Sequence, residues 1–123
     1  KFIIISMYSI GTDIVKVERI KKLLEDNGDK FLNKIYTESE ILYCNSNSKP
    51  YIHLSGKYAA KEAVKKALLS KRFIESITLK NIEILNYENK SPYVKIYNLE
   101  DVNIDVTISH ESHYAVAFAL IEK

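Results

Sequence analysis

Two carboxylates and one lysine are the strongest candidates for chemistry in this sequence. Asp13 follows a short apolar segment, and Glu62 and Lys66 stand four residues apart in an alanine-rich segment. At about 100° per residue, Glu62 and Lys66 share one face of a helix. Carboxylates act as general acids and bases or as ligands of hard cations. Spacing alone favours a structural interpretation: Asp13 would cap a helix beginning at Ile14, and Glu62 and Lys66 would form an exposed ion pair contributing about 0.2–0.5 kcal/mol.

Other catalytic classes find little support. There is no G-x-S-x-G nucleophile motif, and Cys44 has no histidine near it in sequence. The glycines are isolated at positions 11, 28 and 56, which disfavours a glycine-rich phosphate loop. His110 and His113 are three residues apart, a spacing that fits neither a helical zinc pair nor a zinc finger.

The N-terminal half predicts a strand followed by helices. A strand is expected over Tyr8–Ile14, and apolar residues then recur with helical spacing up to Leu24, before Asn27-Gly28 ends the helix. Thr37 and Glu40 form a capping-box pattern that starts another helix. The polar stretch Asn45–Pro50 is expected to be a loop within one domain.

The second half predicts one long helix and four strands. Alanines give Ser55–Leu69 a stripe of small apolar residues, which allows close packing of this helix. A hairpin is expected from Ile77–Leu85 and Tyr93–Tyr97, and a second strand pair from Asp105–Ser109 and Tyr114–Ile121. The last strand is apolar on both faces and is therefore expected to be central and covered on both sides, in either the monomer or an oligomer. The order indicates an α+β fold with an antiparallel sheet.

Composition limits the class of protein further. The chain has 123 residues, 46% of them apolar and 28% charged, which is typical of one globular domain, expected over residues 1–123. The net charge of +2 is far below that of a duplex-binding module. No apolar run approaches the roughly 18–20 residues of a membrane span. A lone Cys44 excludes an internal disulfide and favours a reducing compartment.

Four local motifs together resemble the holo-acyl-carrier-protein synthases, the small 4′-phosphopantetheinyl transferases. They occur in order over nearly the whole chain. The motifs are Ile10–Val15 with Arg19, Phe31–Thr37 with Glu40, Gly56–Ala63 with Lys66, and Thr107–His110 with Tyr114 and Ala115.

The resemblance implies a reaction and a set of site residues. Members transfer the 4′-phosphopantetheine arm of coenzyme A to a serine of apo-acyl carrier protein, in support of fatty acid biosynthesis. Asp13 and Glu62 would hold Mg²⁺, which stabilises charge on the pyrophosphate. Lys66 would donate to the leaving phosphate, and Glu62 or a water on the metal would take the serine proton. The candidate contacts to the nucleotide phosphates are Lys57, Lys61, Ser109 and His110.

The resemblance also implies macromolecular partners. Acyl carrier proteins are acidic, so basic residues of the first helical region would form the docking face: Arg19, Lys22, Lys30 and Lys34. Members are homotrimers, which would cover the second face of the last strand. The expected location is the bacterial cytoplasm, or a plastid-type organelle if the chain comes from a eukaryote with AT-rich genes.

Three departures from the family pattern concern binding and turns. Lys57 stands where the family commonly has Arg, which weakens bidentate phosphate recognition but keeps the charge. Leu69–Lys71 replaces a Gly-Thr-Gly turn, and Lys90 or Ser91 replaces a hairpin glycine. The alternative functions are a non-catalytic basic domain that binds an acidic protein and, less favoured, a nucleic-acid binder.

Overall fold

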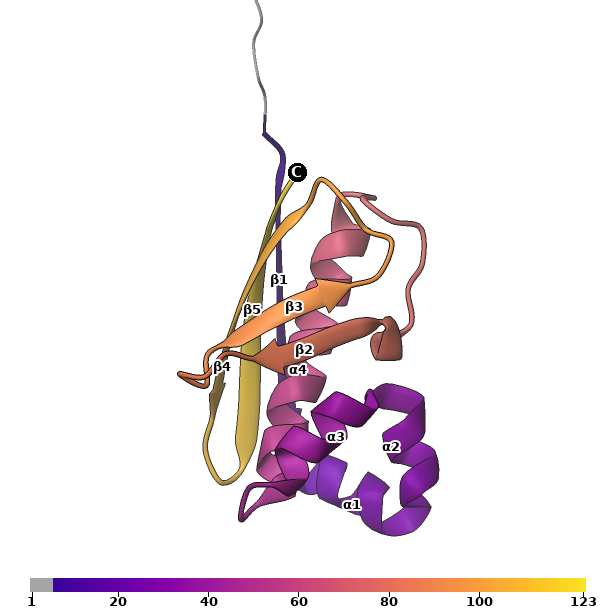
Figure 1. Ribbon diagram of the computed structural model, residues 1–123, viewed down its shortest axis with the longest axis vertical. Helices are drawn as coiled ribbons and strands as arrows, with labels where there is room; N and C mark the ends of the chain where they lie inside the picture. Colours follow the sequence, from indigo (N-terminus) through magenta and orange to yellow (C-terminus); the bar gives the residue numbers. More distant parts are fainter. Residues whose placement is uncertain (1–5) are drawn as a thin grey trace, which may run out of the picture.

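The fold consists of a three-stranded sheet, a two-stranded hairpin and four helices, as seen in a computed structural model that describes residues 6–123 (Figure 1). Residues 1–5 lie outside the described part. The elements are β1 (Tyr8–Lys16), α1 (Val17–Asn27), α2 (Asp29–Ile35), α3 (Glu38–Asn45), α4 (Pro50–Ser70), the 3₁₀ turn η1 (Leu79–Asn81), β2 (Ile82–Asn86), β3 (Pro92–Ile96), β4 (Asn103–His110) and β5 (Tyr114–Glu122). This arrangement confirms the predicted α+β class.

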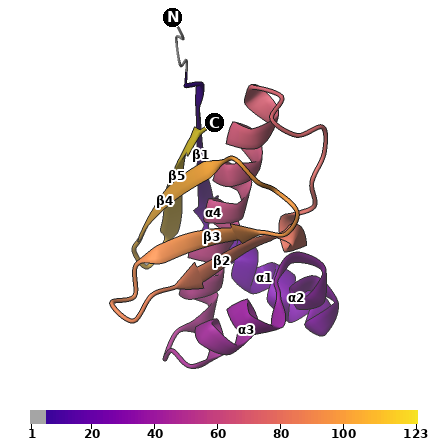
Figure 2. The ribbon, with the colours of Figure 1, turned by 45° about the horizontal axis from the view of Figure 1, so that its top comes forward.

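The larger sheet has the order β1-β5-β4, and both pairs of strands are antiparallel. Strand β5 is central, as predicted, and pairs Ala117 with Asp13 of β1 and with Ile108 of β4. Helix α4 crosses one face of this sheet, while the β2–β3 hairpin packs against α4 from another side (Figures 1 and 2). Helices α1, α2 and α3 gather around the N-terminal end of α4. No helix of the described residues is long and apolar enough to cross a membrane.

Small residues bring α4 very close to β1. A Cβ atom on Gly11 would overlap the carbonyl oxygen of Ala63 and would lie 2.9 Å from the Ala67 nitrogen. Next to this contact, the Ser9 hydroxyl donates to the carbonyl oxygen of Ala67 over 2.6 Å. The alanines and Gly11 therefore place the middle of α4 directly on the strand that carries Asp13.

Strand β1 is longer than predicted, so the first helix begins later. Residues up to Lys16 stay paired with β5, and the amide of Val17 donates to the carbonyl of His113 over 2.9 Å. Exposed Ile14 and buried Val15 follow the alternation of a strand rather than the spacing of a helix. The expectation of an Asp13 cap on a helix starting at Ile14 is therefore wrong: Asp13 lies inside β1, and α1 has no side-chain cap.

Local signals at helix ends are confirmed. Helix α1 ends at Asn27, and Gly28, at φ 51°, donates its amide to the Leu24 carbonyl. Thr37 and Glu40 form both hydrogen bonds of the capping box at α3. Helix α4 starts at Pro50 rather than Ser55, because proline suits the first turn of a helix. The hairpin is confirmed, but β2 starts only at Ile82, since Leu79–Asn81 forms the 3₁₀ turn.

The outer face of the larger sheet carries exposed apolar side chains on β1 and β5, whereas the outward residues of β4, from Asn103 to Ser109, are polar. On β5, Ala115, Ala117, Ala119 and Ile121 are buried against α4, whereas Val116 and Phe118 are 39% and 42% exposed. Ile10 and Ile14 of β1 lie on the same outer face and are more than 60% exposed. The expected cover on both sides of β5 is therefore absent from the described single chain.

Candidate functional site

Asp13 and Lys66 meet where β1 crosses α4. The Lys66 Nζ atom lies 3.3 Å from Asp13 Oδ1 and donates to the Thr12 carbonyl over 2.9 Å. The Lys66 side chain is 57% exposed and that of Asp13 is 17% exposed. The ion pair is thus with Asp13 and not, within the described residues, with Glu62, the partner expected from i,i+4 spacing. The Lys66 ammonium remains accessible to a ligand.

Glu62 is the second candidate carboxylate identified from the sequence. It lies one helical turn before Lys66 on the same side of α4 and is partly exposed. No group of three or more His, Cys, Asp or Glu side chains within residues 6–123 is placed to hold a metal ion. The chain can therefore offer two carboxylates, Asp13 and Glu62, and a cation held there would take its other ligands from phosphate oxygens and water, as Mg²⁺ commonly does.

Lys57 is a buried lysine at the edge of a pocket. Its Nζ donates to the Ile84 carbonyl over 2.7 Å and to Asn86 Oδ1 over 2.6 Å, and it lies 4.6 Å from the centre of the Tyr43 ring. Burial lowers the pKa of Lys57. Two of its three donors are used inside the protein, which leaves one for a ligand.

Lys61 lies fully inside the protein. Its Nζ is 2.8 Å from Glu40 Oε1 and donates to the carbonyls of Leu79 and Ile82 over 2.9 and 2.7 Å. Both side chains of the Lys61–Glu40 pair have no exposed surface, and burial lowers the pKa of Lys61. All three ammonium donors are engaged. In place of the expected phosphate contact, Lys61 joins α4 to α3 and β2.

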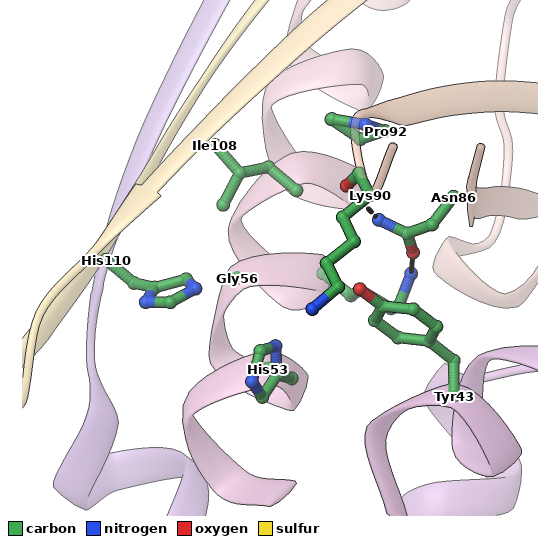
Figure 3. Close-up of a pocket in the computed structure, with 9 residues that line it drawn as sticks. Tyr43, His53, Gly56, Asn86, Lys90, Pro92, Ile108 and His110 are labelled. Carbon is green, nitrogen blue, oxygen red and sulfur yellow. Dashed lines mark hydrogen bonds between the residues drawn. The ribbon is translucent and has the colours of Figure 1, made fainter. Parts of the chain in front are cut away.

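A pocket of about 230 Å³ opens between α4, β4 and the hairpin (Figure 3). Lys57 and His110, both expected to contact phosphate, line it together, whereas Ser109 projects from the opposite face of β4. Gly56 keeps the floor open, because a Cβ there would lie 3.0 Å from the Ile108 side chain. The lining residues are Tyr43, His53, Gly56, Lys57, Asn86, Lys90, Pro92, Ile108 and His110.

Sequence reasoning overlooked three polar residues of this pocket: His53, Asn86 and Lys90. His53 stands four residues before Lys57, so helical spacing alone could have placed it beside Lys57. Asn86 and Lys90 flank the hairpin turn, and only the packing of the hairpin on α4 brings them to the site.

The four expected docking residues are exposed on two consecutive helices. Arg19 and Lys22 lie on α1, and Lys30 and Lys34 lie on α2. The Arg19 guanidinium is 5.7 Å from the centre of the Tyr58 ring on α4, a distance that allows a cation–π contact. This contact orients Arg19 without burying its charge.

The structure combines a long helix packed on an antiparallel sheet, a lysine paired with a carboxylate at their contact, and a second region of the helix with a pocket lined by lysines and histidines. The sequence model of the 4'-phosphopantetheinyl transferase superfamily matches residues 9–119. The chain belongs to this superfamily.

Curated relatives give the same result. The chain is 51% identical over 112 residues to the holo-[acyl-carrier-protein] synthase of Thermodesulfovibrio yellowstonii, covering 91% of this chain and 96% of the relative. It is 42% identical over 120 residues to that of Aquifex aeolicus, covering 93% and 98%.

Solved structures of such synthases have the same fold. The Neisseria meningitidis enzyme matches with a TM-score of 0.81 at 30% identity, covering 94% of this chain and 98% of the other. The Bacillus anthracis enzyme, in complex with CoA (3',5'-ADP), matches with a TM-score of 0.77 at 30% identity, covering 93% and 95%.

Proposed function

We propose that this chain is a holo-acyl-carrier-protein synthase, which transfers 4′-phosphopantetheine from coenzyme A to a serine of apo-acyl carrier protein in support of fatty acid biosynthesis. The observation that carries the proposal is the contact of Lys66 with Asp13 beside Glu62, in a chain of this superfamily. Coenzyme A complexes of the related synthases of Bacillus anthracis and Helicobacter pylori support the choice of donor.

The reaction exchanges one phosphorus–oxygen bond for another. The serine oxygen forms a bond to the phosphorus that carries the pantetheine arm, and the pyrophosphate bond to the nucleotide breaks. Adenosine 3′,5′-bisphosphate leaves with the bonding electron pair, and the serine proton goes to the Glu62 carboxylate or to water. Lys66 donates a hydrogen bond to the leaving phosphate, where negative charge builds up. Lys57 and His110 line the pocket that would hold a nucleotide phosphate.

The donor set at Asp13 and Glu62 fits Mg²⁺. Hard cations prefer oxygen ligands, and Mg²⁺ is typically held by one or two carboxylates together with substrate phosphates. We therefore assign Asp13 and Glu62 as its protein ligands. When bound, the ion would neutralise charge on the pyrophosphate of coenzyme A.

The exposed apolar residues of β1 and β5 support a homotrimer. Ile10, Ile14, Val116 and Phe118 place large apolar groups in water on one contiguous surface. Such a surface typically marks an interface between proteins. Arg19, Lys22, Lys30 and Lys34 would form the separate docking face for the acidic carrier protein.

Mass spectrometry of apo-acyl carrier protein tests the function directly. After incubation with this chain, coenzyme A and Mg²⁺, the carrier protein should gain the mass of one phosphopantetheine group. Binding of the carrier protein without any gain of mass would favour the alternative, a non-catalytic basic interaction domain.

A further inference from the structure

Two histidines face each other in the pocket beside α4. His53 comes from α4 and His110 from β4, and their ring centres are 5.3 Å apart at an angle of 74° (Figure 3). The His53 ring also meets the Tyr43 ring of α3 edge to face, with ring centres 6.2 Å apart. The pair therefore lies where α3, α4 and β4 meet, and each histidine belongs to a regular secondary-structure element.

Every charged or titratable neighbour of His53 that the structure describes in this pocket is a base or a phenol. Lys57 lies one turn further along α4, Lys90 reaches in from the hairpin turn, His110 comes from β4 and Tyr43 from α3. None of the described lining residues is a carboxylate. An anion in this pocket would meet two lysines, Lys57 and Lys90, and two histidines, which can become cationic.

The backbone of Lys90 has an unusual conformation. Its φ of 73° lies in the left-handed region, which residues with a side chain rarely adopt. Its amide donates to the Tyr87 carbonyl over 2.8 Å, and its carbonyl accepts from Asn86 over 2.9 Å. The turn thus fixes the Lys90 backbone while the side chain points into the pocket.

The surroundings of His53 in the free protein disfavour its charged form. Burial is the main cause that lowers its pKa from the ordinary 6.5, and repulsion by His110, Lys57 and Lys90 lowers it further. A bound phosphate would reverse the electrostatic part of this effect, because it places negative charge among the same groups.

We propose that His53 is a phosphate-binding residue of this pocket and takes up a proton from solvent when a nucleotide phosphate binds. The inference rests on the proposed function, which supplies the nucleotide as ligand. Once protonated, the imidazole donates from both ring nitrogens and adds a positive charge beside Lys90 and His110. Binding of phosphate and binding of a proton therefore strengthen each other.

The coupling has a defined direction. The nucleotide-bound protein holds the His53 proton more tightly than the free protein. The affinity for the nucleotide therefore rises as pH falls from the His53 pKa of the bound protein to that of the free protein. Uptake of one full proton changes affinity by about tenfold for each pH unit. Phosphate esters themselves gain a proton near about pH 6, so the effect is best measured above that pH.

Calorimetric titration with adenosine 3′,5′-bisphosphate tests the proposal. The titration is run between about pH 6.5 and 8 in two buffers of different ionisation enthalpy, which reports the protons taken up. Wild type should take up protons and bind more tightly at the lower pH. His53→Gln should take up fewer protons. It should bind the nucleotide about three- to tenfold more weakly than wild type near about pH 6.5, with little difference in affinity near about pH 8.

His113→Gln is the matched control, because His113 lies in the exposed turn before β5, within hydrogen-bond distance of Ser112 and 3.5 Å from the Glu111 carboxylate. It should behave as wild type. Proton magnetic resonance of the wild-type imidazoles gives a second readout that needs no variant: the His53 titration midpoint should rise when the nucleotide binds. Equal proton uptake by wild type and His53→Gln, an unmoved His53 midpoint, or no nucleotide binding would each overturn the proposal.

The carrier-protein assay keeps the two proposals separate. Phosphopantetheine transfer by wild type without proton uptake would leave the function in place and remove the role of His53. Proton-coupled nucleotide binding without any transfer would do the opposite.

Discussion

At the scale of a single residue, replacing Lys66 tests whether its role is catalytic or structural. Its ammonium contacts the Asp13 carboxylate and the Thr12 carbonyl, yet 57% of the side chain is exposed. An ion pair this exposed contributes between about 0 and 1 kcal/mol to stability. A large effect of its removal would therefore have to come from the reaction.

Lys66→Met should lower turnover about a hundredfold or more, with a smaller effect on coenzyme A affinity, because a positioned donor acts mainly on charge that develops during the reaction. Lys66→Arg should not restore full turnover, since its planar head places its donors elsewhere. The measurement is turnover and coenzyme A affinity at saturating Mg²⁺. Lys65→Met, the neighbour on α4, is the control. Losses below about threefold in both Lys66 variants would match an ordinary surface pair.

Asp13→Ala and Glu62→Ala should each abolish transfer while leaving the fold intact. The reason is that Mg²⁺ needs these oxygen ligands to neutralise the pyrophosphate. Transfer is measured by mass spectrometry, folding by circular dichroism, and Glu75→Ala, an exposed carboxylate after α4, is the control. Full activity of either variant in the presence of EDTA would contradict the assignment.

At the scale of elements, the Lys61–Glu40 pair joins three parts of the fold. Glu40 accepts from the Thr37 amide at the start of α3 and from the Ile84 amide of β2, while Lys61 anchors α4. Since Glu62 follows Lys61 on the same helix, the pair also helps set where α4 presents its functional side chains.

Lys61→Met should destabilise the protein by about 3–5 kcal/mol, because it leaves the Glu40 charge buried without a partner. Glu40→Gln/Lys61→Met should lose less than the sum of the two single variants, since it removes both charges and keeps an acceptor oxygen. Urea unfolding measures the free energies, and Lys71→Met, exposed at the end of α4, is the control. If Lys61→Met lowers the free energy of unfolding by no more than about 0.5 kcal/mol, as expected for a surface residue, the prediction is wrong.

At the scale of the whole molecule, two surfaces have different characters. The outer face of β1 and β5 carries large apolar side chains, and Ile10 and Ile14 are more than 60% exposed. Helices α1 and α2 carry four exposed basic residues, Arg19, Lys22, Lys30 and Lys34, among exposed acidic ones such as Glu18 and Glu25. The first surface suits association of identical chains, and the second suits an acidic partner.

Phe118→Glu should turn a trimer into a monomer and lower transfer activity, because it places a charge in the centre of the apolar face. Sedimentation or light scattering should give wild type three times the 14.2 kDa mass of the chain. Tyr97→Glu replaces an exposed aromatic residue in the turn after β3 and should stay trimeric. The trimer proposal fails if wild type is monomeric or if Phe118→Glu assembles normally.

Arg19→Glu should raise the apparent Michaelis constant for the carrier protein far more than that for coenzyme A. Reversing an exposed charge weakens attraction to an acidic partner, and added salt should weaken the same step. Steady-state kinetics with each substrate varied gives both constants. Arg72→Glu, the other arginine of the chain, is the control. Equal changes in both constants would make Arg19 a structural residue.

The sequence by itself determined the features that depend on adjacent residues. The Thr37–Glu40 capping box, the helix end at Gly28 and the central position of β5 all follow from short patterns. Such features are predictable because their hydrogen bonds and apolar periodicity involve residues close together in the chain. The motif resemblance likewise pointed to the family before any packing was known.

Only the tertiary structure decided which distant groups meet. Lys66 pairs with Asp13 and not, in the described chain, with its helical neighbour Glu62, because Gly11 lets β1 lie directly on α4. Lys61 is buried in an ion pair with Glu40 of α3, and the ring of His53 on α4 contacts the ring of His110 on β4. A side chain's partner and burial depend on how elements pack, and spacing along one element carries no information about what another element brings to it.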